Sequence, residues 1–353
     1  MARETQIATM GFPLGGVNVV APRSAQPEGT CFDCLNVRPF DVSEARSRGG
    51  ARPGISKFVS STIGGTTRVQ DINSTTTVIN SAPASSSLRV RQVLAVAVRG
   101  GTVYQVDSSS VSAATTSGVR TLSSTAPFIF SAELFGRVYY TDGTSYKIWV
   151  AANNTTTDWT PTAGSLPGTD GTTTPRLIEM WRSRLVLSGL RSDPHNWFMS
   201  KLGDPLDWDY APATVTETQA IQGGSGVVGK IGDVITCMIP YSDEILIVGC
   251  DHSIYQIAGD PQASSGRIDL ISDTIGMAFG RPWCRDSAGN VYFFSSLGHV
   301  YVIPGGTGRP QPLTNNSIAP LLIDTNLNTV LVRMVWDEVQ QGLYLFITPF
   351  VYI

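Results

Sequence analysis

The feature that most constrains this chain is a recurring unit of two short apolar strands joined by a turn. The unit occurs six times, at residues 93–104, 128–140, 177–187, 234–248, 283–294 and 330–347. Its strands are rich in Val, Ile, Leu and Tyr, and its turns carry Gly or small polar residues. Four units continue into a third strand, at residues 146–150, 197–199, 254–257 and 299–303. The pattern predicts repeated antiparallel meanders in an all-β chain.

The spacing of the units indicates how the meanders are arranged. Their turns lie 36 to 60 residues apart, at Gly100, Gly136, Ser183, Asp243, Gly289 and Gly342. A propeller blade takes roughly 40–50 residues, and a closed propeller leaves only short, protected strand edges. We therefore predict β-propeller-like repeats over residues 91–353. An irregular β-sandwich or barrel that also meanders is the alternative.

Residues 1–90 lack this repeated pattern of apolar strands and turns. Gly15-Gly16, Pro22 and Pro53-Gly54 interrupt the first part, and residues 60–90 are rich in Ser, Thr and Gly, as expected for a surface loop or a weakly patterned strand pair. We predict an extended N-terminal platform segment over residues 1–90, in which residues 1–60 show no independent core. The sequence stops inside an apolar strand at residues 350–353, so we expect either an unusually short protein or a fragment of a longer polypeptide.

Composition limits the possible partners. Charged residues make up only 15% of the chain, and no stretch has the charge pattern of an exposed helix. The formal charge of −3 gives no basic field that would hold nucleic acid tightly. No apolar run reaches the roughly 18 residues of a membrane-spanning segment, and residues 1–4 are not followed by a secretory signal core. The five cysteines are an odd set, which we expect to be reduced.

Three patterns could carry chemistry, and each lacks a necessary part. Cys31 and Cys34 have zinc-knuckle spacing, but no second ligand pair follows at a suitable distance. Residues 224–229 match the dinucleotide-binding fingerprint, but the β-branched residues after them predict a strand where that site needs a helix. The three histidines, at 195, 252 and 299, lie far apart. We therefore predict no enzyme activity, no metal and no cofactor.

A cluster of three guanidinium groups stands out near the N-terminus. Arg46, Arg48 and Arg52 lie in a glycine-bordered loop. Arginine makes paired, directional hydrogen bonds to carboxylates, so these residues are candidates for a subunit interface. A solvated basic loop is the alternative.

A second cluster combines turn residues with tryptophans. Asp193, Pro194 and Trp197 are followed closely by Asp204 and Trp208. Two Asp-Pro pairs and two indole rings in so short a stretch predict a rigid turn with an aromatic anchor.

The order of several motifs resembles a known family. The motifs are Gly15-Gly16-Val17-Asn18, Cys34-Leu35-Asn36-Val37-Arg38-Pro39, Arg48-Gly49-Gly50-Ala51-Arg52-Pro53-Gly54, Trp197-Phe198-Met199-Ser200 and Gly203-Asp204-Pro205. Together they resemble tail nozzle proteins, also called tail tubular protein B, of short-tailed bacteriophages. The resemblance covers residues 14–58 and 176–210 directly.

The resemblance implies a structural protein of the virion tail, made and assembled in the cytoplasm of the bacterial host. Such proteins form a ring, commonly of six copies, below the portal and adaptor. The ring continues the DNA-ejection channel and is a partner of the tail adaptor and of tail fibre or spike proteins. Genomic DNA would pass through transiently without specific binding, which suits a mildly acidic chain.

Two other propeller functions compete with this interpretation. A carbohydrate-binding or carbohydrate-cleaving propeller, lectin or tailspike-like, would need exposed aromatics beside Asp or Asn in most repeats. The loops around Asp142, Asp251 and Leu297 do not repeat such a set. A scaffold propeller of the WD type would need Trp-Asp at its strand ends, and Trp336-Asp337 is a single instance.

Overall fold

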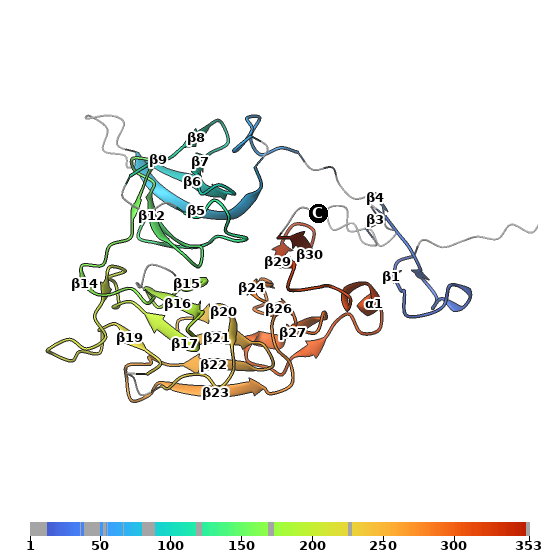
Figure 1. The fold of residues 1–353 in the computed structure, drawn as a ribbon. Helices are drawn as coiled ribbons and strands as arrows, with labels where there is room; N and C mark the ends of the chain where they lie inside the picture. The colour runs from blue at the N-terminus through green and yellow to red at the C-terminus, as the bar shows by residue number, and fades with distance from the viewer. Residues whose placement is uncertain are drawn as a thin grey trace, which may run out of the picture.

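The computed structural model describes residues 13–35, 37–38, 50–51, 54, 56–65, 67–79, 89–117, 122–168, 173–224 and 228–350. Nearly all of its regular structure is β, which confirms the predicted fold class (Figure 1). The helices in these residues are single turns: η1 (Arg23–Ala25), η2 (Pro304–Gly306) and α1 (Ala319–Leu322). None of the helices in this part of the chain is long and apolar enough to cross a membrane.

Four separate sheets form blades of a β-propeller arrangement. The first contains β5 (Val69–Ile79), β6 (Arg89–Val98), β7 (Val103–Val106) and β8 (Val111–Ala113). The second contains β10 (Phe130–Leu134), β11 (Arg137–Thr141), β12 (Tyr146–Val150), β13 (Thr155–Asp158) and, parallel to β13, β9 (Thr115–Thr116). The third contains β15 (Leu177–Trp181), β16 (Arg184–Leu190), β17 (Asp193–Met199) and β19 (Ile221–Gln222). The fourth contains β25 (Trp283–Arg285), β26 (Val291–Phe294), β27 (Val300–Ile303) and β28 (Gln311–Pro312).

A seven-stranded sheet completes the arrangement. Its order is β23 (Arg267–Ser272), β22 (Ile254–Ala258), β21 (Ile245–Cys250), β20 (Ile235–Ser242), β24 (Gly280–Arg281), β29 (Val330–Asp337) and β30 (Gly342–Pro349). It combines a fifth meander, β20 to β23, with the hairpin β29–β30. The short strand β24 joins them, pairing in parallel with both β20 and β29.

All six predicted strand pairs are present as antiparallel hairpins: β6–β7, β10–β11, β15–β16, β20–β21, β25–β26 and β29–β30. The first strands of successive blades lie side by side, with β5 against β10, β10 against β15, β15 against β20 and β25 against β29. These strands therefore line the centre of the arrangement.

The first sheet begins earlier than the sequence pattern indicates. β5 lies within residues 1–90, which we assigned to the N-terminal platform, and pairs along its length with β6. The predicted boundary at residue 91 therefore falls inside β6. Buried positions of β5 include Gln70, Asp71 and Thr75, so the strand lacks the apolar alternation that marks the others.

The described N-terminal strands lie apart from the blades, beside α1 (Figure 1). They are β1 (Gly16–Val17) with β2 (Thr30–Cys31), and β3 (Val37–Arg38) with β4 (Gly50–Ala51). The amide of Asn18 donates to the carbonyl of Asn316 at 3.2 Å, and Val19 N donates to Ser317 O at 2.9 Å. This segment therefore rests on a loop near the other end of the chain.

Aromatic side chains fill the space between neighbouring blades. Trp159 and Trp208 pack edge to face at 5.7 Å between ring centroids, and Tyr139 lies 4.8 Å from Trp159. A short parallel pair, β14 (Ala163–Gly164) with β18 (Asp207–Trp208), brings this part of the chain together. Burying such large rings is a main source of the stability of a core.

Candidate functional site

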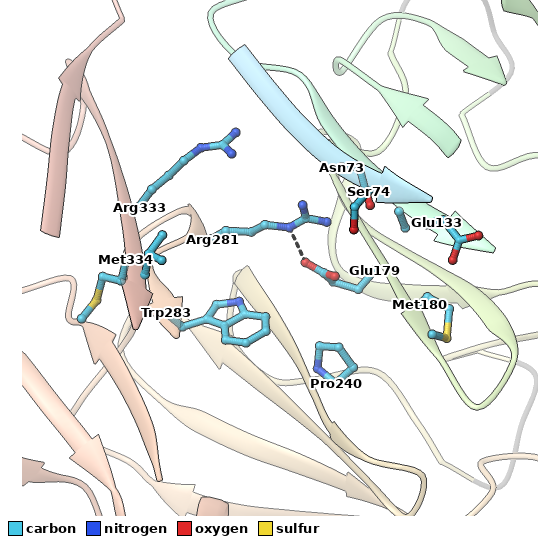
Figure 2. Close-up of a pocket in the computed structure, with 12 residues that line it drawn as sticks. Asn73, Ser74, Glu133, Glu179, Met180, Pro240, Arg281, Trp283, Arg333 and Met334 are labelled. Atoms are coloured by element: carbon cyan, nitrogen blue, oxygen red, sulfur yellow. Dashed lines mark hydrogen bonds and ion pairs between the residues drawn. The ribbon is translucent and has the colours of Figure 1, made fainter. Parts of the chain in front are cut away.

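A cavity of about 500 Å³ lies where the first strands of the blades meet. All six first strands, β5, β10, β15, β20, β25 and β29, contribute side chains to its wall, and so does β24. The polar part of the lining consists of Asn73, Ser74, Glu133, Glu179, Arg281 and Arg333 (Figure 2). The cavity is therefore a place where all blades present side chains to a common space.

Strand alternation explains why charged residues face this space. In β15, Ile178 belongs to the buried core between blades, and the next residue, Glu179, lines the cavity. Likewise Leu134 of β10 is buried in that core while Glu133 lines the cavity. Successive side chains of a strand point to opposite faces of the sheet. When Ile178 and Leu134 point into the core between blades, the neighbouring Glu179 and Glu133 therefore point towards the cavity.

Arg281 of β24 is the centre of the charge network. Its Nε donates to Oε1 of Glu179 at 2.6 Å, and its Nη2 donates to the carbonyls of Ile178, at 3.1 Å, and Ser131. Its Nη1 lies 3.9 Å from Oδ1 of Asp71. One guanidinium therefore connects β24 to the first strands of three other blades.

Asp71 of β5 is the most deeply buried charge of the network, with a side chain that is 0% exposed. It accepts a hydrogen bond at 3.0 Å from Nη1 of Arg333 and another from the hydroxyl of Ser131. Nη2 of Arg333 donates to Gln70 O at 2.6 Å, and its guanidinium lies 5.7 Å from the ring centroid of Phe130. The contacts fasten β29 to β5 and so bring the last described hairpin against the first sheet.

Burial and neighbouring charges shift the pKa values of Glu179 and Arg281 in opposite directions. Burial raises the pKa of the Glu179 carboxyl above its usual value, although attraction to Arg281 opposes the rise. Burial alone would lower the pKa of Arg281, but attraction to Glu179 and Asp71 outweighs it and the pKa is raised. Arg281 is therefore held firmly in its charged form.

This arrangement determines what the site can do chemically. The guanidinium groups of Arg281 and Arg333 direct their hydrogen bonds at acceptors of the protein itself. Each guanidinium thus uses two of its three nitrogens to bond groups of the protein. Among the described residues, no group of three His, Cys, Asp or Glu side chains could hold a metal ion. The charges serve first to hold the blades together.

The predicted arginine cluster cannot be placed, because Arg46, Arg48 and Arg52 lie outside the described residues.

The predicted turn and aromatic anchors lie away from the cavity. Asp193 and Pro194 begin β17 instead of forming a turn; Asp193 pairs with Lys230 at 2.8 Å. Trp197 is 1% exposed, and its Nε1 donates to Gly229 O at 3.2 Å. These residues fix β17 against the segment that leads to the next blade.

The second Asp-Pro pair does form a turn. Oδ1 of Asp204 accepts a hydrogen bond from Leu206 N at 3.0 Å, and Nε1 of the fully buried Trp208 donates to Pro205 O at 3.0 Å. Trp208 packs in the core between the second and third blades. The predicted aromatic anchor is present here as a core residue.

The other sequence patterns occupy ordinary structural positions. Cys31 and Cys34 are free thiols, and burial together with the neighbouring Cys31 raises the pKa of Cys34. Residues 225–227 of the glycine-rich match lie outside the described residues. The described stretch after them leads into strand β20 at Ile235, as the β-branched pattern predicted.

Sequence reasoning missed the charged residues at and beneath the cavity, which we call the axial network: Asp71, Glu133, Glu179, Arg281 and Arg333. The sequence nevertheless carries a signal for some of them. Glu133 and Glu179 are each the single charge of a mainly apolar first strand, and Arg333 lies between apolar residues of β29, which has a second charge, Asp337, at its end. A charge repeated at this position in several blades indicates a common polar centre. Asp71 had no such signal, because its strand is mostly polar.

Comparisons with known proteins add little to this geometry. No protein-family model and no curated protein matches the chain. Solved structures similar to it include the extracellular domains of two proteins of B. thetaiotaomicron that are described as hybrid two component systems. One is 10% identical, with a TM-score of 0.47 over 86% of this chain and 35% of that chain. The other is 10% identical, with a TM-score of 0.45 over 73% and 30%. These values support no inference about function, and the strand pairing alone establishes the fold.

Proposed function

We propose that this chain is a structural component of a bacteriophage tail, in which copies form a ring, or nozzle, that continues the DNA-ejection channel below the portal and adaptor. The single observation that supports it best is the axial network. Its two arginines direct their hydrogen bonds at groups of the protein. These charges thus hold blades together, as suits a structural protein that bears load. The order of the sequence motifs supports the proposal through its resemblance to tail nozzle proteins.

The charge of the chain is compatible with a channel wall. Each phosphate that a wall neutralises adds affinity for DNA that ejection must overcome. A chain with a net charge of −3 adds little such affinity. In this proposal DNA passes transiently, the protein is a homo-oligomer of six copies in the virion tail, and it works without catalysis.

The N-terminal segment is the proposed assembly element. Its described part between residues 13 and 65 rests on the loop at Asn316 and Ser317 through the residues around Asn18. In the described residues of that range, η1 and the short strand pairs are the only regular structure. A segment of this kind needs another surface to pack on. In a ring that surface is the neighbouring copy, which the arginines at positions 46, 48 and 52 would contact.

Replacement of these three arginines by alanine tests the proposal. A ring repeats one heterologous contact at every joint, so a loss of about 1–2 kcal/mol per joint is multiplied around it. We expect the triple variant to sediment as a folded single chain under conditions in which the wild type sediments as a ring. The control variant replaces Arg99, Arg191 and Arg309, three exposed cations outside this segment, by alanine and changes the net charge equally. If both variants assemble like the wild type, the loop has no role in assembly.

A further inference from the structure

The two cysteines of the N-terminal segment lie in contact with each other. Two residues separate Cys31 from Cys34, and the Cys34 thiol is hydrogen-bonded to the Cys31 side chain. Between them the chain bends at Phe32, where the guanidinium of Arg23 lies 4.4 Å from the ring centroid. The bend brings the two sulfur atoms within reach of each other.

The structure holds Cys31 in a fixed place. Cys31 ends β2, which pairs with β1, and its carbonyl accepts a hydrogen bond from Asn18 N at 2.8 Å. Its thiol donates to Gly16 O at 3.6 Å. Because the hydrogen of this thiol points to Gly16, the lone pairs of the sulfur are available to Cys34.

Exposure separates this pair from the other cysteines. Cys31 and Cys34 are partly exposed, whereas Cys237, Cys250 and Cys284 are buried. Burial raises the pKa of Cys250 and of Cys284 to about 12, so these thiols are seldom ionised at neutral pH. A dissolved oxidant reacts with the thiolate form of an accessible cysteine. Of the five cysteines, all of which lie in the described residues, only this pair combines exposure with a partner thiol.

We propose that Cys31 and Cys34 are a redox-active dithiol, which a small disulfide such as glutathione disulfide converts to an internal disulfide. One thiolate of the pair attacks a sulfur of the oxidant and expels a glutathione thiolate, which leaves a mixed disulfide. The second thiolate attacks the protein sulfur of that bond and expels the second glutathione thiolate. The two protons of the dithiol end on the two glutathione molecules. The protein thus loses two hydrogens, and one molecule of oxidant is reduced.

The disulfide changes how the N-terminal segment is held. It joins β2 to the residues that lead to β3, next to the contact in which Val19 N donates to Ser317 O. In a reducing compartment we expect the pair to stay a dithiol, and in an oxidising one we expect it to close. The inference stands on the two thiols and does not depend on the tail role.

Mass spectrometry of the oxidised full chain tests the proposal. The folded chain is incubated with glutathione disulfide, unfolded in N-ethylmaleimide, which blocks every remaining thiol, and digested with trypsin. Residues 24–46 form one tryptic peptide, because trypsin does not cleave between Arg38 and Pro39, and its cysteines are Cys31 and Cys34.

We expect this peptide to lose two hydrogens and to take no maleimide. The change should be at least about tenfold faster than oxidation of the three buried cysteines. A peptide that still carries two maleimide groups, or that carries glutathione without an internal disulfide, overturns the proposal. Oxidation of the buried cysteines at the same rate also contradicts it.

Variants then locate the reaction. Cys31→Ser and Cys34→Ser each leave one thiol of the pair, so we expect each to stop at the mixed disulfide with glutathione. Cys284→Ala is the matched control, because it removes a buried thiol and should leave the internal disulfide unchanged. Circular dichroism confirms folding of each variant. An internal disulfide that still forms in both serine variants, or that is lost in the folded control, contradicts the assignment.

Discussion

Arg333 donates to Asp71 at 3.0 Å, although 262 positions of the chain separate them. Arg333 lies in β29, in the last described hairpin, and Asp71 lies in β5, in the first sheet. The bond therefore joins the two ends of the propeller arrangement. Ring folds often join their ends by strand pairing; here a buried ion pair supplies a link between β29 and β5.

The Asp71 carboxylate should be critical for stability. Asp71→Asn keeps the shape of the side chain but removes the charge that faces Arg333 and Arg281. We expect the free energy of unfolding to fall by about 3 kcal/mol, because removing one partner leaves buried charges uncompensated. Urea unfolding measures the change. Asp269→Asn is the control, since that carboxylate is 37% exposed and pairs with the exposed Arg267. It should change stability by less than about 1 kcal/mol. Equal losses in the two variants would contradict this account of the network.

Asp233 should make stability depend on pH in a defined direction. Burial alone would raise its pKa, but hydrogen bonds from His252 N, Ser253 Oγ and Val234 N outweigh burial and lower the pKa below the usual value of 3.8. A lowered carboxyl pKa stabilises the folded state above that usual value, and the stabilisation is lost as pH falls through the folded-state pKa. Asp233→Asn should therefore cost about 1–2 kcal/mol at neutral pH and progressively less below about pH 4. A gap between wild type and variant that stays constant from pH 7 to about pH 3 would be inconsistent with this shift.

A substitution in the turn between β10 and β11 should increase the stability of the chain. Phe135 and Gly136 both have positive φ, 55° and 72°, and Phe135 is 61% exposed. Asn followed by Gly is the preferred pair for such two-residue hairpins. Phe135→Asn should thus stabilise the chain by about 1 kcal/mol and raise the melting temperature by about 2 °C, whereas Gly136→Ala should lower it. Calorimetry measures both. A lower melting temperature for Phe135→Asn would mean that the exposed ring makes a stabilising contact.

Zinc should leave stability unchanged. Cys31 and Cys34 are a pair of thiols, and the described residues around them supply no further ligands for a tetrahedral site. A ligand that binds only the folded state must raise its melting temperature. Thermal unfolding with zinc and with a chelator should therefore give the same midpoint. A rise of several degrees with zinc would show that residues outside the described ranges complete a site.

The local sequence pattern was sufficient to predict the hairpins, but not the charged contacts between their first strands. Runs such as Val138 to Tyr140, preceded by Phe135-Gly136, carry both strand preference and turn chemistry within a few residues. For residues 60–90 the sequence left both a surface loop and a weakly patterned strand pair open, because the buried side of β5 includes Asp71 and Thr75, which break the apolar alternation. The partners of Asp71 come from other blades, and no local pattern specifies contacts over such separations. The positions of single charges in apolar strands were visible, but their pairing depends on how the blades are arranged.

Electron microscopy of the purified full chain tests the central claim, that copies of this propeller assemble into a tail ring, most directly. Negatively stained particles should be closed rings of uniform diameter with a central channel, commonly with six subunits in end-on views. The Arg46, Arg48 and Arg52 triple alanine variant should give single propellers on the same grids. Wild-type fields that contain only isolated propellers, at concentrations where the chain is folded and soluble, would contradict the claim.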